Sequence, residues 1–137
     1  MVTLNDSSLD WALNHINKYN DTDIFPRPFE FDAINNNWKK IKEKLKHVDL
    51  ANMKFSEYRT AVTAKGLTGF RIATQFDPID SRLLNAILYE ISETIERCRV
   101  DKNLEIVHSY RLKPLDDGTL YDKEYSWSSF VEKARQM

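Results

Sequence analysis

The sequence predicts an α+β fold in which helices accompany a single antiparallel β-hairpin. Residues 57–63 and 70–76 are rich in β-branched and aromatic side chains, and they flank the glycine-bearing stretch 65–69, which favours a hairpin with a five-residue loop. A helical repeat then follows, because apolar residues recur at spacings that place them on one helix face: Leu83, Leu84, Ile87, Leu88, Ile91, Ile95 and Cys98.

The N-terminal part predicts a helix followed by an extended segment. Ser7 or Ser8 can cap a helix that runs to about Tyr19. Residues 24–31 alternate prolines with aromatics, and each proline disfavours helix in the residue before it. We expect this segment to be a strap whose phenylalanines pack across the core of the domain; the alternative is a ligand for another protein.

A second helix is predicted from Asp32, the expected N-cap, to Val48. Its apolar positions recur at spacings of four and three residues: Ile34, Trp38, Ile41, Leu45 and Val48. Its other faces carry Lys39, Lys40, Lys42, Lys44 and Lys46. These lysines form either a solvated face or a track for a nucleic-acid backbone.

The helix after the hairpin has clear start signals. Asp77 offers an N-cap oxygen and Pro78 suits the first turn, so we expect a helix over 78–99 that packs on the sheet. Segment 104–112 alternates enough to add a third strand, and 114–118 makes a turn. A last helix is expected over 127–136, capped by Ser126. The length of 137 residues predicts that 1–137 is a single domain or part of one.

The composition is that of an ordinary soluble domain. Twenty basic residues oppose 21 acidic ones, giving a net charge of −1, so any site for phosphate must be local. The single cysteine, Cys98, excludes an internal disulfide and is expected to be buried on a helix. The N-terminus lacks the form of a secretion signal and no apolar run reaches membrane-spanning length, which predicts a cytoplasmic protein with no membrane partner.

Several parts of the chain together resemble a known family. The spacing of Lys65, Gly66, Gly69 and Arg71 is followed by QFDPIDSRLLNAILYEISETIERCR and then by VHSYRLKPLDDGTLYD, while DTDIFPRPFEFDAI precedes them. This long pattern resembles the fingers region of bacterial reverse transcriptases, in the defence-associated branch near retron and abortive-infection enzymes. The resemblance covers nearly the whole chain.

The resemblance implies a nucleotide site on the hairpin. In the enzymes it resembles, the fingers present a lysine and an arginine to the triphosphate of the incoming dNTP, and these positions fall on Lys65 and Arg71. Arg111, in Ser109-Tyr110-Arg111, resembles the next fingers motif and is a weaker candidate ligand. The implied partners are dNTP, an RNA or DNA template-primer and a palm-bearing polypeptide. Without the resemblance, the spacing of Lys65 and Arg71 favours solvated residues at the ends of a hairpin. Arg111 is then equally well an ordinary strand arginine.

Catalytic residues are not expected in this chain. The family's catalytic aspartates lie in the palm, and the sequence contains no Tyr-x-Asp-Asp motif, so Mg²⁺ is expected only for a complete polymerase. The acidic residues near candidate positions have local structural reasons, as helix caps or turn residues: Asp77, Asp80, Asp116 and Asp117. His15, His47 and His108 lack metal-ligand spacing. The alternatives are a stand-alone protein- or nucleic-acid-binding module and a degenerate mobile-element remnant.

Overall fold

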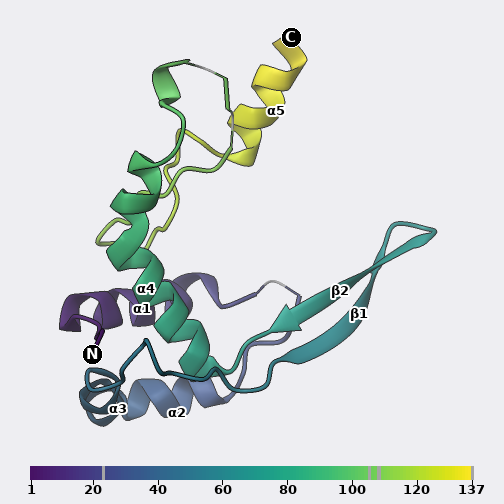
Figure 1. The fold of residues 1–137 in the computed structure, drawn as a ribbon. Coiled ribbons are helices and arrows are strands. Elements are labelled where there is room, and N and C mark those ends of the chain that lie inside the picture. The colour runs from purple at the N-terminus through teal and green to yellow at the C-terminus, as the bar shows by residue number, and fades with distance from the viewer. Residues whose placement is uncertain (23, 105, 108, 137) are drawn as a thin grey trace.

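The structure, a computed structural model, describes residues 1–22, 24–104, 106–107 and 109–136 (Figure 1). It confirms the α+β class. The described elements are α1 (Asp6–Tyr19), α2 (Glu30–Asn36), α3 (Trp38–Leu45), β1 (Arg59–Lys65), β2 (Gly69–Gln75), α4 (Pro78–Arg97), the short 3-10 helix η1 (Lys102–Leu104) and α5 (Trp127–Gln136).

The core lies where α1 packs across α4, with α3 beneath them (Figure 1). Leu9 and Ala12 of α1 meet Leu83 and Ala86 of α4, and all four are at most 1% exposed. Small alanines at the crossing let the two helices approach closely, and the larger side chains fill the space around them. Trp11, Leu45 and Leu120 complete this core.

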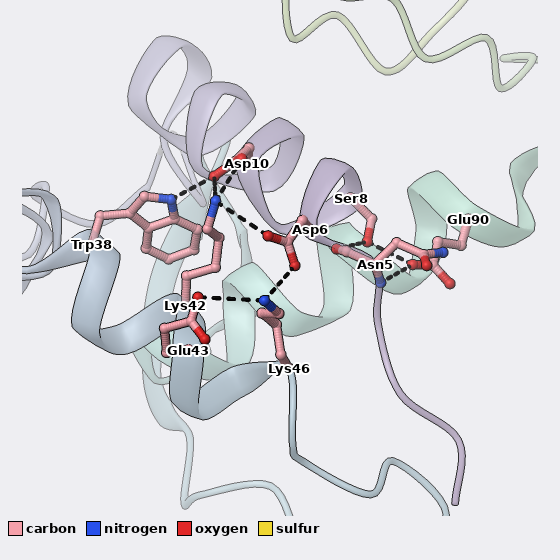
Figure 2. A network of polar contacts seen from close by, with 9 residues as sticks. All are labelled: Asn5, Asp6, Ser8, Asp10, Trp38, Lys42, Glu43, Lys46 and Glu90. Carbon is pink, nitrogen blue, oxygen red and sulfur yellow. Dashed lines mark hydrogen bonds and ion pairs between the residues drawn. The ribbon is translucent and has the colours of Figure 1, made fainter.

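Polar contacts fix α3 on α1 (Figure 2). The carboxylate of Asp10 accepts hydrogen bonds from the indole of Trp38 at 2.7 Å and from the ammonium of Lys42 at 2.8 Å. Lys46 pairs with Asp6 at 3.0 Å. Two of the five lysines predicted on this helix are therefore bound by acidic residues of α1. The two alternatives, a solvated face or a track for a nucleic-acid backbone, now concern only Lys39, Lys40 and Lys44.

The prediction of one helix from the N-cap Asp32 to Val48 was wrong, because the segment is broken into α2 and α3. Asn37 separates them with φ −114° and ψ 16°, and its side-chain amide donates to the carbonyl of Ala33 at 2.9 Å. This side-chain bond competes with helix continuation. The start was also misplaced: α2 begins at Glu30, so Asp32 lies in its first turn instead of capping it.

The start of α4 was predicted correctly and its packing was not. Asp77 Oδ1 accepts from the backbone N–H of Ile79 at 2.8 Å, as an N-cap should. The helix packs against α1 and not on the sheet, because the hairpin extends sideways from its first turn (Figure 1). It ends at Arg97, and Cys98 beyond it is exposed, which corrects the expectation of a buried thiol.

The third strand is not seen in the described part of 104–112; residues 105 and 108 lie outside the described residues. Leu112 instead forms an isolated antiparallel bridge with Tyr121. The turn at 114–118 forms as predicted, with the N–H of Gly118 donating to Leu115 O at 3.0 Å.

The predicted strap is only partly buried. Phe31 is fully buried, while Phe29 is 81% exposed. Phe31 already belongs to α2, so the extended part is shorter than 24–31. The last helix, α5, starts at Trp127 as expected, and the hydroxyl of Ser126 accepts from the N–H of Ser129 at 3.5 Å.

Candidate nucleotide-binding site

The hairpin places Lys65 and Arg71 on the same face. Arg71 pairs with Thr63, and Lys65 pairs with Gly69. Since side chains alternate along a strand, Thr63 and Lys65 share a face with Arg71. The two cations are diagonal neighbours, about 7–8 Å apart at the backbone. Their long side chains can therefore reach the same group of phosphates.

This face, which we call the basic hairpin face, carries only positive charges. It consists of the register pairs 59–75, 61–73, 63–71 and 65–69. It carries Arg59, Lys65 and Arg71, and the whole hairpin from Arg59 to Gln75 contains no acidic residue. Lys65 and Arg71 are exposed, and neither head group has an ion-pair or hydrogen-bond partner among the described residues.

The tip of the hairpin is tighter than the sequence indicated. The strands extend to Lys65 and Gly69, so three loop residues replace the expected five. Gly66 has φ +69°, a conformation that L side chains rarely adopt. At Gly69 an added Cβ would lie 2.9 Å from the carbonyl oxygen of Lys65. Both glycines are therefore required by the backbone, and the tip holds Lys65 on an ordered strand end.

The base of the hairpin is anchored to the segment between α1 and α2 and to the first residue of α2. The amide of Gln75 donates to Asp21 Oδ2 at 3.2 Å, and Arg59 lies 3.6 Å from a Glu30 oxygen. Ala73, on the same face, is 5% exposed. The basic hairpin face is thus covered at its base and free toward its tip, where Lys65 and Arg71 lie.

Arg59 was missed by the sequence reasoning. It lies on the same face as Lys65 and Arg71 because its register partner is Gln75. Strand alternation would have found it, since residues 59, 65 and 71 fall on one face once the hairpin register is known. Its pairing with Glu30 makes it less available than the two cations at the tip.

Arg111 lies far from this face. Its side chain is 8% exposed and donates to Glu96 Oε2 at 3.1 Å and to the carbonyl of Val100 at 2.5 Å. These contacts are at the C-terminal end of α4, whereas the hairpin joins its N-terminal end. A helix of 20 residues spans about 30 Å. The structure therefore brings Lys65 and Arg71 together and leaves Arg111 at a separate place.

Glu96 is the centre of the contacts around Arg111. Burial alone would raise the pKa of this carboxyl, but hydrogen bonds from the Leu112 N–H, Arg111 and Arg99 outweigh it and lower the pKa below its ordinary value. Beside it lies a hollow of about 430 Å³ whose cationic lining includes Arg97, Lys102 and Lys113. No periodic pattern in the sequence predicts this hollow, because its lining comes from segments that meet only in the fold.

Two findings concern metal binding and membrane insertion. Among the residues that the structure describes, no three His, Cys, Asp or Glu side chains are grouped so that they could hold a metal ion. No helix in the described ranges is long and apolar enough to cross a bilayer.

Comparison of the chain with protein-family models, with curated proteins and with solved structures finds no significant match. The resemblance to reverse-transcriptase fingers therefore rests on the sequence pattern alone.

Proposed function

We propose that this chain binds the phosphates of a nucleoside triphosphate on the basic hairpin face, as the fingers portion of a reverse-transcriptase-like RNA-directed DNA polymerase. One observation carries the proposal: Lys65 and Arg71 share a face, are exposed, and have no partner among the described residues. A guanidinium binds phosphate oxygens through two parallel hydrogen bonds, and an ammonium adds a compact charge.

The local charge supports a phosphate ligand more than a protein carboxylate. The net charge of the chain is −1, so long-range attraction does not favour nucleic acid. On the hairpin itself the balance is different, because three cations face no acid within the 17 residues from Arg59 to Gln75. Multiple negative charges in a chain, as in a triphosphate, match this arrangement better than one carboxylate does.

The hairpin does not fit a catalytic metal. Mg²⁺ prefers carboxylate oxygens, and the hairpin has none. By the resemblance, the carboxylates that bind Mg²⁺ in a complete polymerase come from a palm on other residues. We therefore propose binding without catalysis for this chain, and expect no templated primer extension by the purified 137-residue protein. Detectable extension would refute that expectation.

The binding is tested by titrating dNTP and inorganic tripolyphosphate against the chain. Lys65→Ala combined with Arg71→Ala should weaken both ligands about tenfold or more, because two charge-assisted contacts are lost. The control is Lys39→Ala with Lys40→Ala, which removes the same charge from exposed positions of α3. Equal losses in the two double variants would show only general charge attraction and would refute the site.

A second candidate function, a protein-docking module, is favoured by a separate apolar surface. Trp127 and Phe130 of α5 are 62% and 41% exposed, and together with Tyr110 they line a hollow of about 200 Å³. Large exposed aromatics are typical of protein interfaces. A palm-bearing polypeptide is the partner that the resemblance implies. Loss of its binding in Trp127→Ser, with triphosphate affinity unchanged, would favour this function.

A further inference from the structure

The second face of the hairpin is uncharged and apolar. Its register pairs are Thr60 with Thr74, Val62 with Ile72, and Ala64 with Phe70. Continuing the alternation beyond the strands adds Tyr58 and Phe76. We call the set Tyr58, Val62, Phe70, Ile72 and Phe76 the apolar hairpin face. It lies opposite Lys65 and Arg71, so the two sides of one hairpin differ completely in chemistry.

The apolar hairpin face is open to solvent. The exposed fractions are 61% for Tyr58, 71% for Val62 and Phe70, 68% for Ile72 and 41% for Phe76. Leu67 at the tip is also fully exposed. The hairpin extends away from the helices, so the described part of the chain leaves this face uncovered (Figure 1).

Two physical arguments indicate that this face has a partner. A two-stranded hairpin alone is marginally stable, and it normally needs a third strand or a packed layer against its apolar face. Taking about 200 Å² for a large side chain, the exposed fractions give roughly 80–140 Å² for each member of the face and on the order of 600 Å² in all. Leu67 at the tip adds on the order of 200 Å². The largest apolar patch of an ordinary monomer is about 300–600 Å².

We propose that the apolar hairpin face packs against the same face of a second copy of this chain. The area of each copy is close to the ~800 Å² per partner of a stable interface. The face carries no charge, so apposing two copies brings no like charges together. In a two-fold interface the same patch meets itself, which suits a face of uniform chemistry. The basic hairpin face of each copy stays outside this contact.

The test measures the mass of the purified chain by sedimentation velocity from low to high micromolar concentration. The wild type should shift from monomer to dimer, and Ile72→Lys should remain monomeric because it places a charge at the centre of the face. Leu104→Lys is the matched control, since Leu104 is 61% exposed but lies in η1. It should dimerise as the wild type does.

A charge-swap experiment identifies the face directly. The central register pair is Val62 with Ile72, so the two-fold axis passes near it and brings the Ile72 side chains of both copies together. Ile72→Lys and Ile72→Glu should each be monomeric, and their equimolar mixture should recover a heterodimer. The double variant Lys65→Ala with Arg71→Ala should dimerise normally, which separates this contact from phosphate binding.

A wild type that stays monomeric at high micromolar concentration would overturn the proposal. So would dimerisation that survives Ile72→Lys. A monomeric wild type whose affinity for single-stranded DNA falls in Ile72→Lys would instead assign the face to stacking of bases, and would equally refute the dimer.

Discussion

At the residue scale, Arg111 shows how a basic side chain suggested as a ligand is used by the fold. Its guanidinium is nearly buried and is held between Glu96 and the carbonyl of Val100. Removing the negative charge of Glu96 would leave a buried cation unpaired, which is more costly than losing a surface ion pair. Arg111 therefore has a structural task in this chain, whether or not it also contacts a nucleotide.

Glu96→Gln should lower the free energy of unfolding at pH 7 by roughly 2–4 kcal/mol. The folded-state pKa of Glu96 lies below its ordinary value of 4.5, so its contribution is present above pH 4.5 and is lost as pH falls through the folded pKa. The difference in free energy of unfolding between wild type and Glu96→Gln should therefore become smaller at acid pH. Urea unfolding at several pH values measures it, and Glu93→Gln on the exposed side of α4 is the control. Equal effects of the two substitutions would contradict the role of Glu96.

Arg82 is a second buried arginine and gives a contrasting prediction. It is fully buried, stacks over Phe31 at 4.6 Å, and donates one hydrogen bond, to Pro78 O at 2.8 Å. Its Nε and Nη2 have no hydrogen-bond partner in the described chain. Burial, with a smaller effect from Arg27, lowers the pKa of Arg82 to about 10, so it remains cationic at neutral pH.

Arg82→Met should keep the free energy of unfolding within about 1 kcal/mol of wild type or raise it, because the packing stays and the cost of burying a charge is removed. Arg82→Ala should cost about 2–4 kcal/mol, since it leaves a cavity beside Phe31. Chemical unfolding of both variants measures this. If methionine were as damaging as alanine, the guanidinium charge itself would stabilise the fold.

At the element scale, the turn at 114–118 is docked on α1 by close backbone contact. Gly118 has φ +84°, and its carbonyl accepts from Nδ1 of His15 at 2.8 Å. An added Cβ would lie 3.2 Å from the backbone nitrogen of His15. The Trp11 indole donates to Leu115 O at 2.7 Å, which fixes the other end of the turn.

Gly118→Ala should therefore destabilise the protein more than Gly66→Ala does. Both glycines have positive φ, so both substitutions carry backbone strain of about 1 kcal/mol. A Cβ at Gly118 would also come close to the backbone of α1, whereas nothing lies within 4 Å of a Cβ at Gly66. In thermal unfolding, Gly118→Ala should reduce the free energy of unfolding by about 1–2 kcal/mol more than Gly66→Ala does. Similar losses for the two variants would show that the turn can move away from α1.

The elements that the sequence predicted well are those with local signals. The start of α4 follows from Asp77 and Pro78, and the hairpin follows from the glycines at its tip, because these residues act on their own backbone. The break at Asn37 depends on a side-chain bond to Ala33 that an apolar repeat does not reveal. In the described residues of 104–112, Leu112 forms a bridge with Tyr121 instead of a third strand. The packing of α4 on α1 instead of the sheet could not be read from α4, since an apolar stripe does not name its partner.

At the scale of the whole molecule, three places in the described ranges gather basic residues. One is the hairpin tip with Lys65 and Arg71, the second is the exposed side of α3 with Lys39, Lys40 and Lys44, and the third is the hollow beside Arg111. The sequence predicted the first site by resemblance, and the structure adds that its two cations share a face. Sequence patterns could not predict the hollow beside Arg111, because α4 and the segment 109–125 meet only in the fold.

The most direct test of phosphate binding at the hairpin maps the ligand on the chain. Backbone amide NMR shifts, recorded while inorganic tripolyphosphate is added, report each of the three basic places separately. We predict that the largest changes fall on residues 63–71 and disappear in Lys65→Ala with Arg71→Ala. Changes centred on α3 or on the hollow beside Arg111, or none on the hairpin at saturating ligand, would contradict the proposed site.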